Sequence, residues 1–198
     1  MPRPIAPFRL ASAERHQRGY ARAVSASGDK RRAPSLMLRS YALESEVERL
    51  LREKRYELAV LLSQTLLELR VEAELVDYFK ILREERFGEA AVGLLPSYNI
   101  GNGRVQTFFE RLVGERLRDA NAGAMAALRA HVELRNRVAH RGEQVGEEAA
   151  RASLAAVLRV SQLVHELAYR SLGLEDVLEE EARQEQEDSG EAEHDDWG

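Results

Sequence analysis

Residues 56–86 constrain the fold of this chain more than any other stretch. Apolar side chains recur there every three or four positions, which is the period of an α-helix. The series is Leu58, Leu62, Thr65, Leu69, Val76, Phe79 and Leu82, with one longer step over Ala73. Further leucines between these positions widen the stripe, so the helix needs neighbours on more than one side. The stretch therefore predicts the central helix of a helical bundle.

The rest of the chain predicts more helices and no strand. Ser45 and Glu48 form a capping-box pattern ahead of a short first helix. Glycines, a proline and an asparagine mark residues 87–103 as a loop, and Gly142 and Gly173 predict helix ends. No segment alternates apolar and polar residues over the length of a strand. We expect an all-α antiparallel bundle of four or five helices, at residues 45–51, 56–86, 105–117, 124–141 and 147–172.

Charge divides the chain into three parts. Residues 1–39 carry nine basic and two acidic residues, a net charge of +7, and lack an apolar period. Residues 175–198 carry twelve acidic residues against Arg183, a net charge of −11. We therefore predict a basic flexible leader at 1–39, a helical domain at 40–174 and an acidic disordered tail at 175–198.

Composition excludes several classes of protein. The chain has no cysteine, so it has neither disulfides nor thiolate metal ligands, and a reducing compartment is expected. No apolar run approaches the roughly 20 residues of a membrane span. His and acidic residues lack zinc-ligand spacing, and no nucleophile-elbow sequence is present. We expect a cytoplasmic protein with no membrane contact, no metal and no cofactor.

Arg135 breaks an otherwise apolar stripe. Met125, Leu128, Val132 and Val138 follow the helical period, and at about 100° per residue Arg135 falls among them. An arginine there must be paired or must face an anion or a partner subunit, because an unpaired buried charge costs several kcal/mol.

His140 follows five residues after Arg135, at the end of the same expected helix. Histidine is the side chain best suited to proton transfer near neutral pH. On a continuous helix Arg135 and His140 would point about 140° apart. We therefore expect them to meet only if the backbone breaks near them, or if two subunits face each other.

The segment Arg135-Asn136-x-x-x-His140 resembles the motif of the HEPN family, the higher eukaryotes and prokaryotes nucleotide-binding domain. That motif is an arginine, often followed by a polar residue, and then a histidine four to six residues later. The resemblance extends over residues 45–172, including a short first helix followed by a long buried one. It implies an HEPN-like helical bundle, a homodimer in which two motifs share one cleft, and metal-independent cleavage of RNA.

The resemblance implies that Arg135, Asn136 and His140 are catalytic. A histidine accepts the proton of the RNA 2′-hydroxyl or protonates the leaving 5′-oxygen, and a guanidinium stabilises the phosphate charge. The products would carry 2′,3′-cyclic phosphate and 5′-hydroxyl ends. Around the motif, further residues are candidates for substrate binding (Arg137, Arg141 and His131) and for support of the site (Glu68 and Glu143).

By analogy with the family, such an enzyme would act as a toxin, in phage defence or in stress, and an inhibitor or antitoxin protein would be a partner. The toxin branch that pairs with a nucleotidyltransferase antitoxin usually has a tyrosine three residues after the histidine. This chain has Glu143 there. Modification of that tyrosine therefore has no counterpart in this sequence.

Two alternatives stay open at this stage. The same helical dimer could be a non-catalytic module that binds a nucleotide, RNA or protein. Arg135 could instead form a structural ion pair, for example with Glu68, while His140 caps a helix end. The charge of −11 also motivates the hypothesis that the acidic tail occupies a basic cleft as a mimic of RNA.

Overall fold

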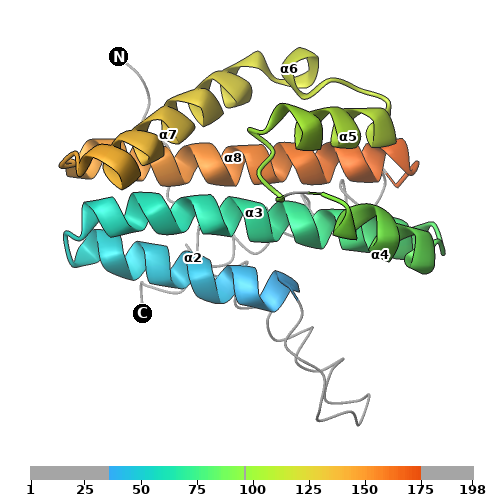
Figure 1. Ribbon diagram of the computed structural model, residues 1–198, viewed down its shortest axis with the longest axis horizontal. Helices are drawn as coiled ribbons and strands as arrows, with labels where there is room; N and C mark the ends of the chain where they lie inside the picture. The colour runs from blue at the N-terminus through green and yellow to red at the C-terminus, as the bar shows by residue number, and fades with distance from the viewer. Residues whose placement is uncertain (1–35, 96, 175–198) are drawn as a thin grey trace, which may run out of the picture.

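The computed structural model describes residues 36–95 and 97–174, and these residues are almost entirely helical. They contain seven helices and no strand, which confirms the all-α prediction for the described part of the chain (Figure 1). The helices are α2 (Leu36–Arg52), α3 (Tyr56–Ile81), α4 (Glu85–Gly93), α5 (Gly103–Val113), α6 (Leu117–Ala120), α7 (Ala122–Arg141) and α8 (Glu147–Ser171).

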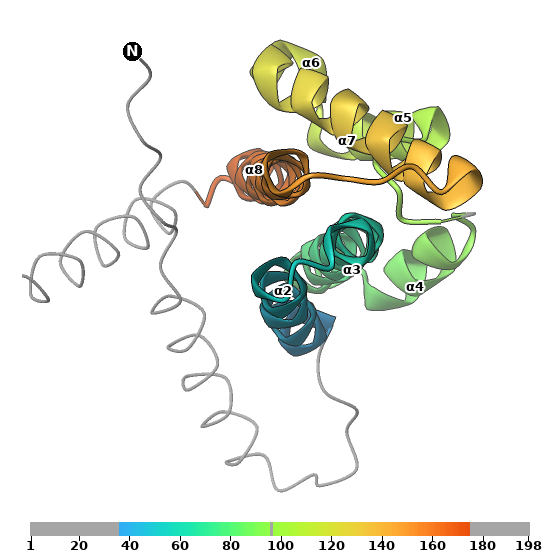
Figure 2. The ribbon, with the colours of Figure 1, turned by 90° about the vertical axis from the view of Figure 1, so that its left-hand side faces the viewer.

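Helix α3 is the centre of the packing, as its apolar pattern predicts. It lies between α2 on one side and α7 and α8 on the other (Figures 1 and 2). Val60, Leu66, Leu67 and Val71 are fully buried along it. Taken in chain order, the four long helices α2, α3, α7 and α8 alternate in direction (Figure 1). The antiparallel arrangement follows from the short turns that join α2 to α3 and α7 to α8.

The first helix is longer than the sequence predicted. Helix α2 begins at Leu36, so Ser45 lies within it and does not cap it, contrary to the expected capping box. Its buried residues continue the helical period back to Ser40, whose hydroxyl donates to the carbonyl of Met37 at 2.8 Å. The sequence does not mark where this helix begins, because a serine can cap a helix or bond to a carbonyl inside one.

Residues 87–103 are only partly a loop, because the first seven of them belong to α4. Gly88 suggested a break, yet it is buried inside this helix. A Cβ built at Gly88 would lie 2.4 Å from Cβ of Phe79, so the glycine allows α4 to approach α3 closely. Gly88 therefore serves helix packing rather than a turn.

Asparagines start two of the later helices. The Oδ1 of Asn102 accepts from the N–H of Arg104 at 2.9 Å, and that of Asn121 accepts from Ala124 at 2.9 Å. The Gly101-Asn102-Gly103 segment is therefore the N-cap of α5. The helix expected at 105–117 ends earlier, at Val113, because Gly114 takes a left-handed conformation with a φ of 77°.

The described residues have more helices than the four or five expected, since α4 and the four-residue α6 were not predicted. Helix α8 ends at Ser171, and Gly173 follows with a φ of 69°, as the sequence indicated. Within the described residues no helix has the length and apolarity needed to cross a membrane. The acidic tail and all but the last four residues of the basic leader lie outside the described residues.

We predict that Gly88→Ala destabilises the bundle by about 1–3 kcal/mol, because the new Cβ would overlap the Phe79 side chain and push α4 from α3. Urea unfolding followed by circular dichroism measures the change. Gly93→Ala is the matched control in the same helix, since nothing lies within 4 Å of a Cβ there. Equal stability of the two variants would contradict the proposed close contact.

Candidate functional site

The motif predicted from the sequence lies in the last two turns of α7, which stays helical through Arg141. Gly142 ends the helix with a φ of 63°, and its N–H donates to the carbonyl of Val138 at 3.1 Å. This bond is the single 5→1 bond of an αL-type helix end, and the N–H of Glu143 lies 3.5 Å from the carbonyl of Arg137. Because the helix does not break between Arg135 and His140, their Cβ atoms project about 140° apart.

Arg135 lies at the edge of the core. It is half-buried and follows His131 and precedes Val138 in the row of α7 residues that faces the bundle. Among the described residues no carboxylate forms a salt bridge with its guanidinium. Nη1 of Arg135 instead donates to Oδ1 of the next residue, Asn136, at 3.0 Å. The charge is thus held by a neutral acceptor and is still available to an anion.

Asn136 connects the arginine to the histidine surface. Asn136 and His140 are both exposed and lie one turn apart on the same face of α7. The bond from Arg135 to Asn136 therefore turns the guanidinium toward the face that carries His140. In this way the structure brings the three predicted catalytic residues to one surface, although Arg135 and His140 start from different sides of the helix.

His131 is buried in a polar network that joins three helices. Its side chain is 2% exposed, and both ring nitrogens have partners. Nε2 lies 3.1 Å from Oε1 of Gln64 on α3, and Nδ1 lies 2.6 Å from Oγ of Ser153 on α8. Nε2 of Gln64 donates to Oε1 of Glu68 at 2.8 Å, which leaves the Gln64 oxygen to accept from the imidazole.

Burial, together with the Arg135 guanidinium, lowers the pKa of His131 from 6.5 to about 4. The imidazole is therefore neutral at physiological pH. Its Nε2 carries the proton toward Gln64, and its Nδ1 accepts from the Ser153 hydroxyl. His131 contributes to the packing of α7 on α3 and α8 in a single copy of the chain. Its predicted contact with substrate stays a prediction.

Arg137 and Glu143 bind each other. The Nε of Arg137 donates to both carboxylate oxygens of Glu143, at 3.0 and 2.9 Å. Both side chains are about 40% exposed, so the pair is worth little in free energy, but it closes the chain over the end of α7. A phosphate bound at Arg137 would have to compete with Glu143. Arg141 is exposed and has no such partner within the described residues.

The loop after α7 is fixed to the first turn of α3. The N–H of the buried Val145 donates to Oε1 of Glu57 at 2.9 Å, and this bond lowers the pKa of Glu57. Tyr56 reaches Glu147 at the start of α8 at 3.2 Å. The motif therefore lies where the start of α3, the end of α7 and the start of α8 come together (Figure 1).

Glu68 does not pair with Arg135. It is half-buried and receives the amide of Gln64, so it is connected to His131 rather than to the arginine. Within residues 36–95 and 97–174, the structure therefore gives no support to a structural ion pair of Arg135 with Glu68. No group of three or more His, Asp or Glu residues in these ranges is placed to hold a metal ion.

Gln64 and Ser153 are the residues near the site that sequence patterns missed. Gln64 is 3% exposed and lies among the leucines of α3. The signal that singled out Arg135, a polar residue within an apolar stripe, was also present at Gln64. Ser153 gave no signal, because small hydroxyl residues are common inside helices that pack closely.

Comparisons of the chain with protein-family models, with characterised proteins and with solved structures find no match. The residues and their geometry therefore carry the functional inference, together with the resemblance of the motif itself.

We predict that His131 makes the fold sensitive to acid. The native imidazole has a pKa of about 4, whereas the unfolded chain has an ordinary value near 6.5. Between these values the unfolded chain takes up a proton that the native state does not. The contribution of neutral His131 to the free energy of unfolding is therefore complete above pH 6.5. About 3 kcal/mol of it is lost as the pH falls to 4.

Urea unfolding at pH 7 and at pH 4.5 tests this prediction with the wild type and His131→Gln. Carboxylates titrate in both proteins, so the difference between the two proteins isolates the histidine. We expect wild type to be the more stable at pH 7 and the difference to shrink at pH 4.5. His140→Gln is the control, because His140 is exposed. A difference that does not change with pH would refute the prediction.

Proposed function

We propose that this protein is a metal-independent endoribonuclease with a site built by Arg135, Asn136 and His140 on α7. One observation carries the proposal. A half-buried guanidinium without a carboxylate partner among the described residues is held by Asn136, one turn before an exposed histidine. The resemblance of the motif to that of the HEPN family gives this arrangement its expected chemistry.

RNA supplies its own nucleophile for this reaction. The 2′-oxygen bonds to phosphorus while the bond from phosphorus to the 5′-oxygen breaks. One histidine takes the proton of the 2′-hydroxyl, and another gives a proton to the leaving 5′-oxygen. The Arg135 guanidinium forks onto the phosphate, where negative charge gathers in the transition state. The products are a 2′,3′-cyclic phosphate and a 5′-hydroxyl end.

A second copy of the chain supplies the second histidine in this proposal. His131 is buried, neutral and bonded at both nitrogens, so it is not a proton carrier for bound RNA. His165 lies on α8 and bonds to Glu74 at 3.0 Å. His140 is then the one exposed histidine among the described residues. A homodimer that faces two α7 ends toward each other would provide an acid and a base.

Side chains at the end of α7, rather than the helix dipole, would attract a polyanion. His140 and Arg141 lie in this last turn, where the partial negative charge of the helix end stabilises cationic side chains. Arg141 is exposed and is placed to hold a phosphate next to the one that reacts. The described domain as a whole is almost neutral, so affinity for RNA would be local to this surface.

The second candidate function is a module that binds RNA or a nucleotide without cleaving it. Among the described residues, one copy has a single exposed histidine, and this favours the alternative, because a lone motif can hold a phosphate but lacks an acid–base pair. A monomer, measured by size-exclusion chromatography with light scattering, would exclude the two-histidine nuclease. A dimer fits both candidates, and the cleavage assay then separates them.

We expect the purified protein to cleave RNA in excess EDTA and to leave cyclic-phosphate ends. His140→Ala should lower the rate by about 10²- to 10⁴-fold, and Arg135→Ala by about 10²- to 10³-fold. Asn136→Ala should lower the rate less, by about tenfold, because it only removes the acceptor that holds the guanidinium. Asn136→Asp keeps an acceptor for the guanidinium. Gel analysis of labelled RNA and of its ends measures all four variants.

Arg129→Ala is the matched control for these variants. Arg129 is exposed on the same helix, and its side chain has no hydrogen-bond partner among the described residues. Its replacement by alanine should therefore leave cleavage unchanged. RNA binding without cleavage by a folded dimer, abolished in Arg135→Ala, would move the conclusion to the binding module. Cleavage that survives in His140→Ala would exclude the proposed site.

Unfolding experiments on Arg135→Ala test the structural alternative. Loss of one partner of a buried ion pair costs about 3–5 kcal/mol. Because Arg135 has no carboxylate partner in the described residues, we expect its replacement to change the free energy of unfolding by no more than about 1 kcal/mol. A loss of several kcal/mol would indicate a structural role instead.

A further inference from the structure

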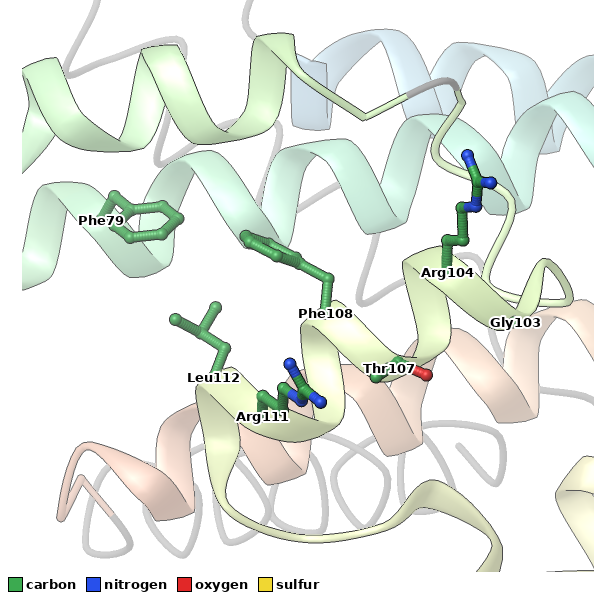
Figure 3. Close-up of a pocket in the computed structure, with 7 residues that line it drawn as sticks. All are labelled: Phe79, Gly103, Arg104, Thr107, Phe108, Arg111 and Leu112. Atoms are coloured by element: carbon green, nitrogen blue, oxygen red, sulfur yellow. The ribbon is translucent and has the colours of Figure 1, made fainter.

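A pocket with an apolar floor lies between α3 and α5, away from the motif (Figure 3). Its volume is about 580 Å³. Phe79 of α3 and Phe108 and Leu112 of α5 point toward one another across it (Figure 3). The remaining lining residues are Gly103, Arg104, Thr107 and Arg111, all from α5. Phe79 is 4% exposed and forms the floor of this groove, whereas Phe108 and Leu112 are partly exposed on the side of α5 that faces α4.

Two arginines stand on either side of Phe108 in this groove (Figure 3). Arg104 and Arg111 are seven residues apart, so they lie on the same face of α5, separated by about 10 Å along its axis. Both side chains are exposed, and no carboxylate of the described residues forms a hydrogen bond or a salt bridge with either guanidinium. The groove therefore combines an apolar floor with two cations that no described carboxylate neutralises, which suits an acidic ligand with an aromatic or aliphatic group.

Hydrogen bonds through Tyr78 connect the end of α8 to the wall of this groove. The hydroxyl of Ser171 lies 3.3 Å from the hydroxyl of Tyr78, which in turn donates to the carbonyl of Leu112 at 3.2 Å. Tyr78 precedes Phe79, and Leu112 lines the groove. The end of α8 thus lies beside the groove, and residues 175–198 follow it in the sequence.

We propose that the acidic segment 175–198 of the same chain docks in the α3–α5 groove, with the indole of Trp197 on Phe79, Phe108 and Leu112. The segment has twelve acidic residues and one arginine, and it contains the only tryptophan of the chain. Asp195 and Asp196 come directly before Trp197, which places carboxylates beside the anchor where Arg104 and Arg111 can bind them.

Tryptophan fits this groove better than the other apolar residues of the segment. It buries the largest area of any side chain and makes favourable contacts with other aromatic rings and with arginine. The other candidates, Val177 and Leu178, offer smaller aliphatic groups.

Chain length allows this contact. Leu174 and Trp197 are 23 positions apart, and a random-coil chain of that length would have an end-to-end distance of roughly 25 Å. The groove lies beside the point where the segment begins, whereas the motif of α7 lies at the opposite end of the bundle (Figure 1). A nearer site has the higher effective concentration for a tethered ligand. These distances favour the groove over the motif as the site of the tail.

Trp197 itself reports the contact in the full-length protein. We expect its fluorescence to be protected from acrylamide and its indole N–H to give one shifted resonance. In Arg104→Glu/Arg111→Glu the quenching constant should rise about threefold, because repulsion releases the indole into solvent. Arg129→Glu/Arg159→Glu is the matched control, since both arginines are exposed, lie outside the groove and have no salt bridge among the described residues. That control should stay protected.

Other outcomes contradict the proposal. A Trp197 that is fully quenched in the wild type, or that loses protection equally in both double variants, would show that the groove does not hold it. Protection that disappears on dilution would assign the contact to the tail of a second copy. Thermal unfolding verifies that Arg104→Glu/Arg111→Glu is folded, and Arg104→Gln/Arg111→Gln provides a milder variant with a smaller rise. Because these readouts need no RNA, they are independent of the proposed nuclease.

Discussion

The burial of α3 is the constraint on which the rest of the structure depends. The helix is apolar on more than one side, so a single neighbour cannot cover it, and α2, α7 and α8 all pack against it. Burying one large apolar side chain contributes about 1.5–3 kcal/mol, and α3 buries many of them. The direction and order of the long helices follow from this need. The shorter helices α4 and α5 extend the cover toward the end of α3.

A polar network fixes how these helices meet. Gln64, His131 and Ser153 come from α3, α7 and α8, and each is almost fully buried. Buried polar groups must keep their partners, so a shift of one helix along another would leave several of them unsatisfied. The apolar contacts of a bundle alone allow such shifts more easily. The network therefore sets the register of α7, and with it the position of the residues that follow His131 along that helix.

This register places the motif at the surface. Arg135 follows one turn after His131 and lies at the edge of the core, where its guanidinium reaches the neutral oxygen of Asn136. Its positive charge also helps to keep His131 neutral, so the buried histidine and the half-buried arginine have separate roles. At the other end of the bundle, Tyr78 connects α3 with α5 and α8 beside the groove that contains Arg104 and Arg111.

The sequence alone determined the helical class, the central position of α3 and the ends of α7 and α8 at glycines. These features follow from local periodicity and from backbone chemistry, which neighbouring residues fix. Arg135, Asn136 and His140 were selected through the resemblance of their motif, and their catalytic role stays a prediction. Only the tertiary structure decided that Gly88 lies inside a helix, that His131 is buried with Gln64 and Ser153, and that Glu68 does not meet Arg135. Each of these depends on a contact between helices far apart in the chain. A pattern along one helix indicates which face is apolar, but the packing of the helices decides which side chains that face contacts.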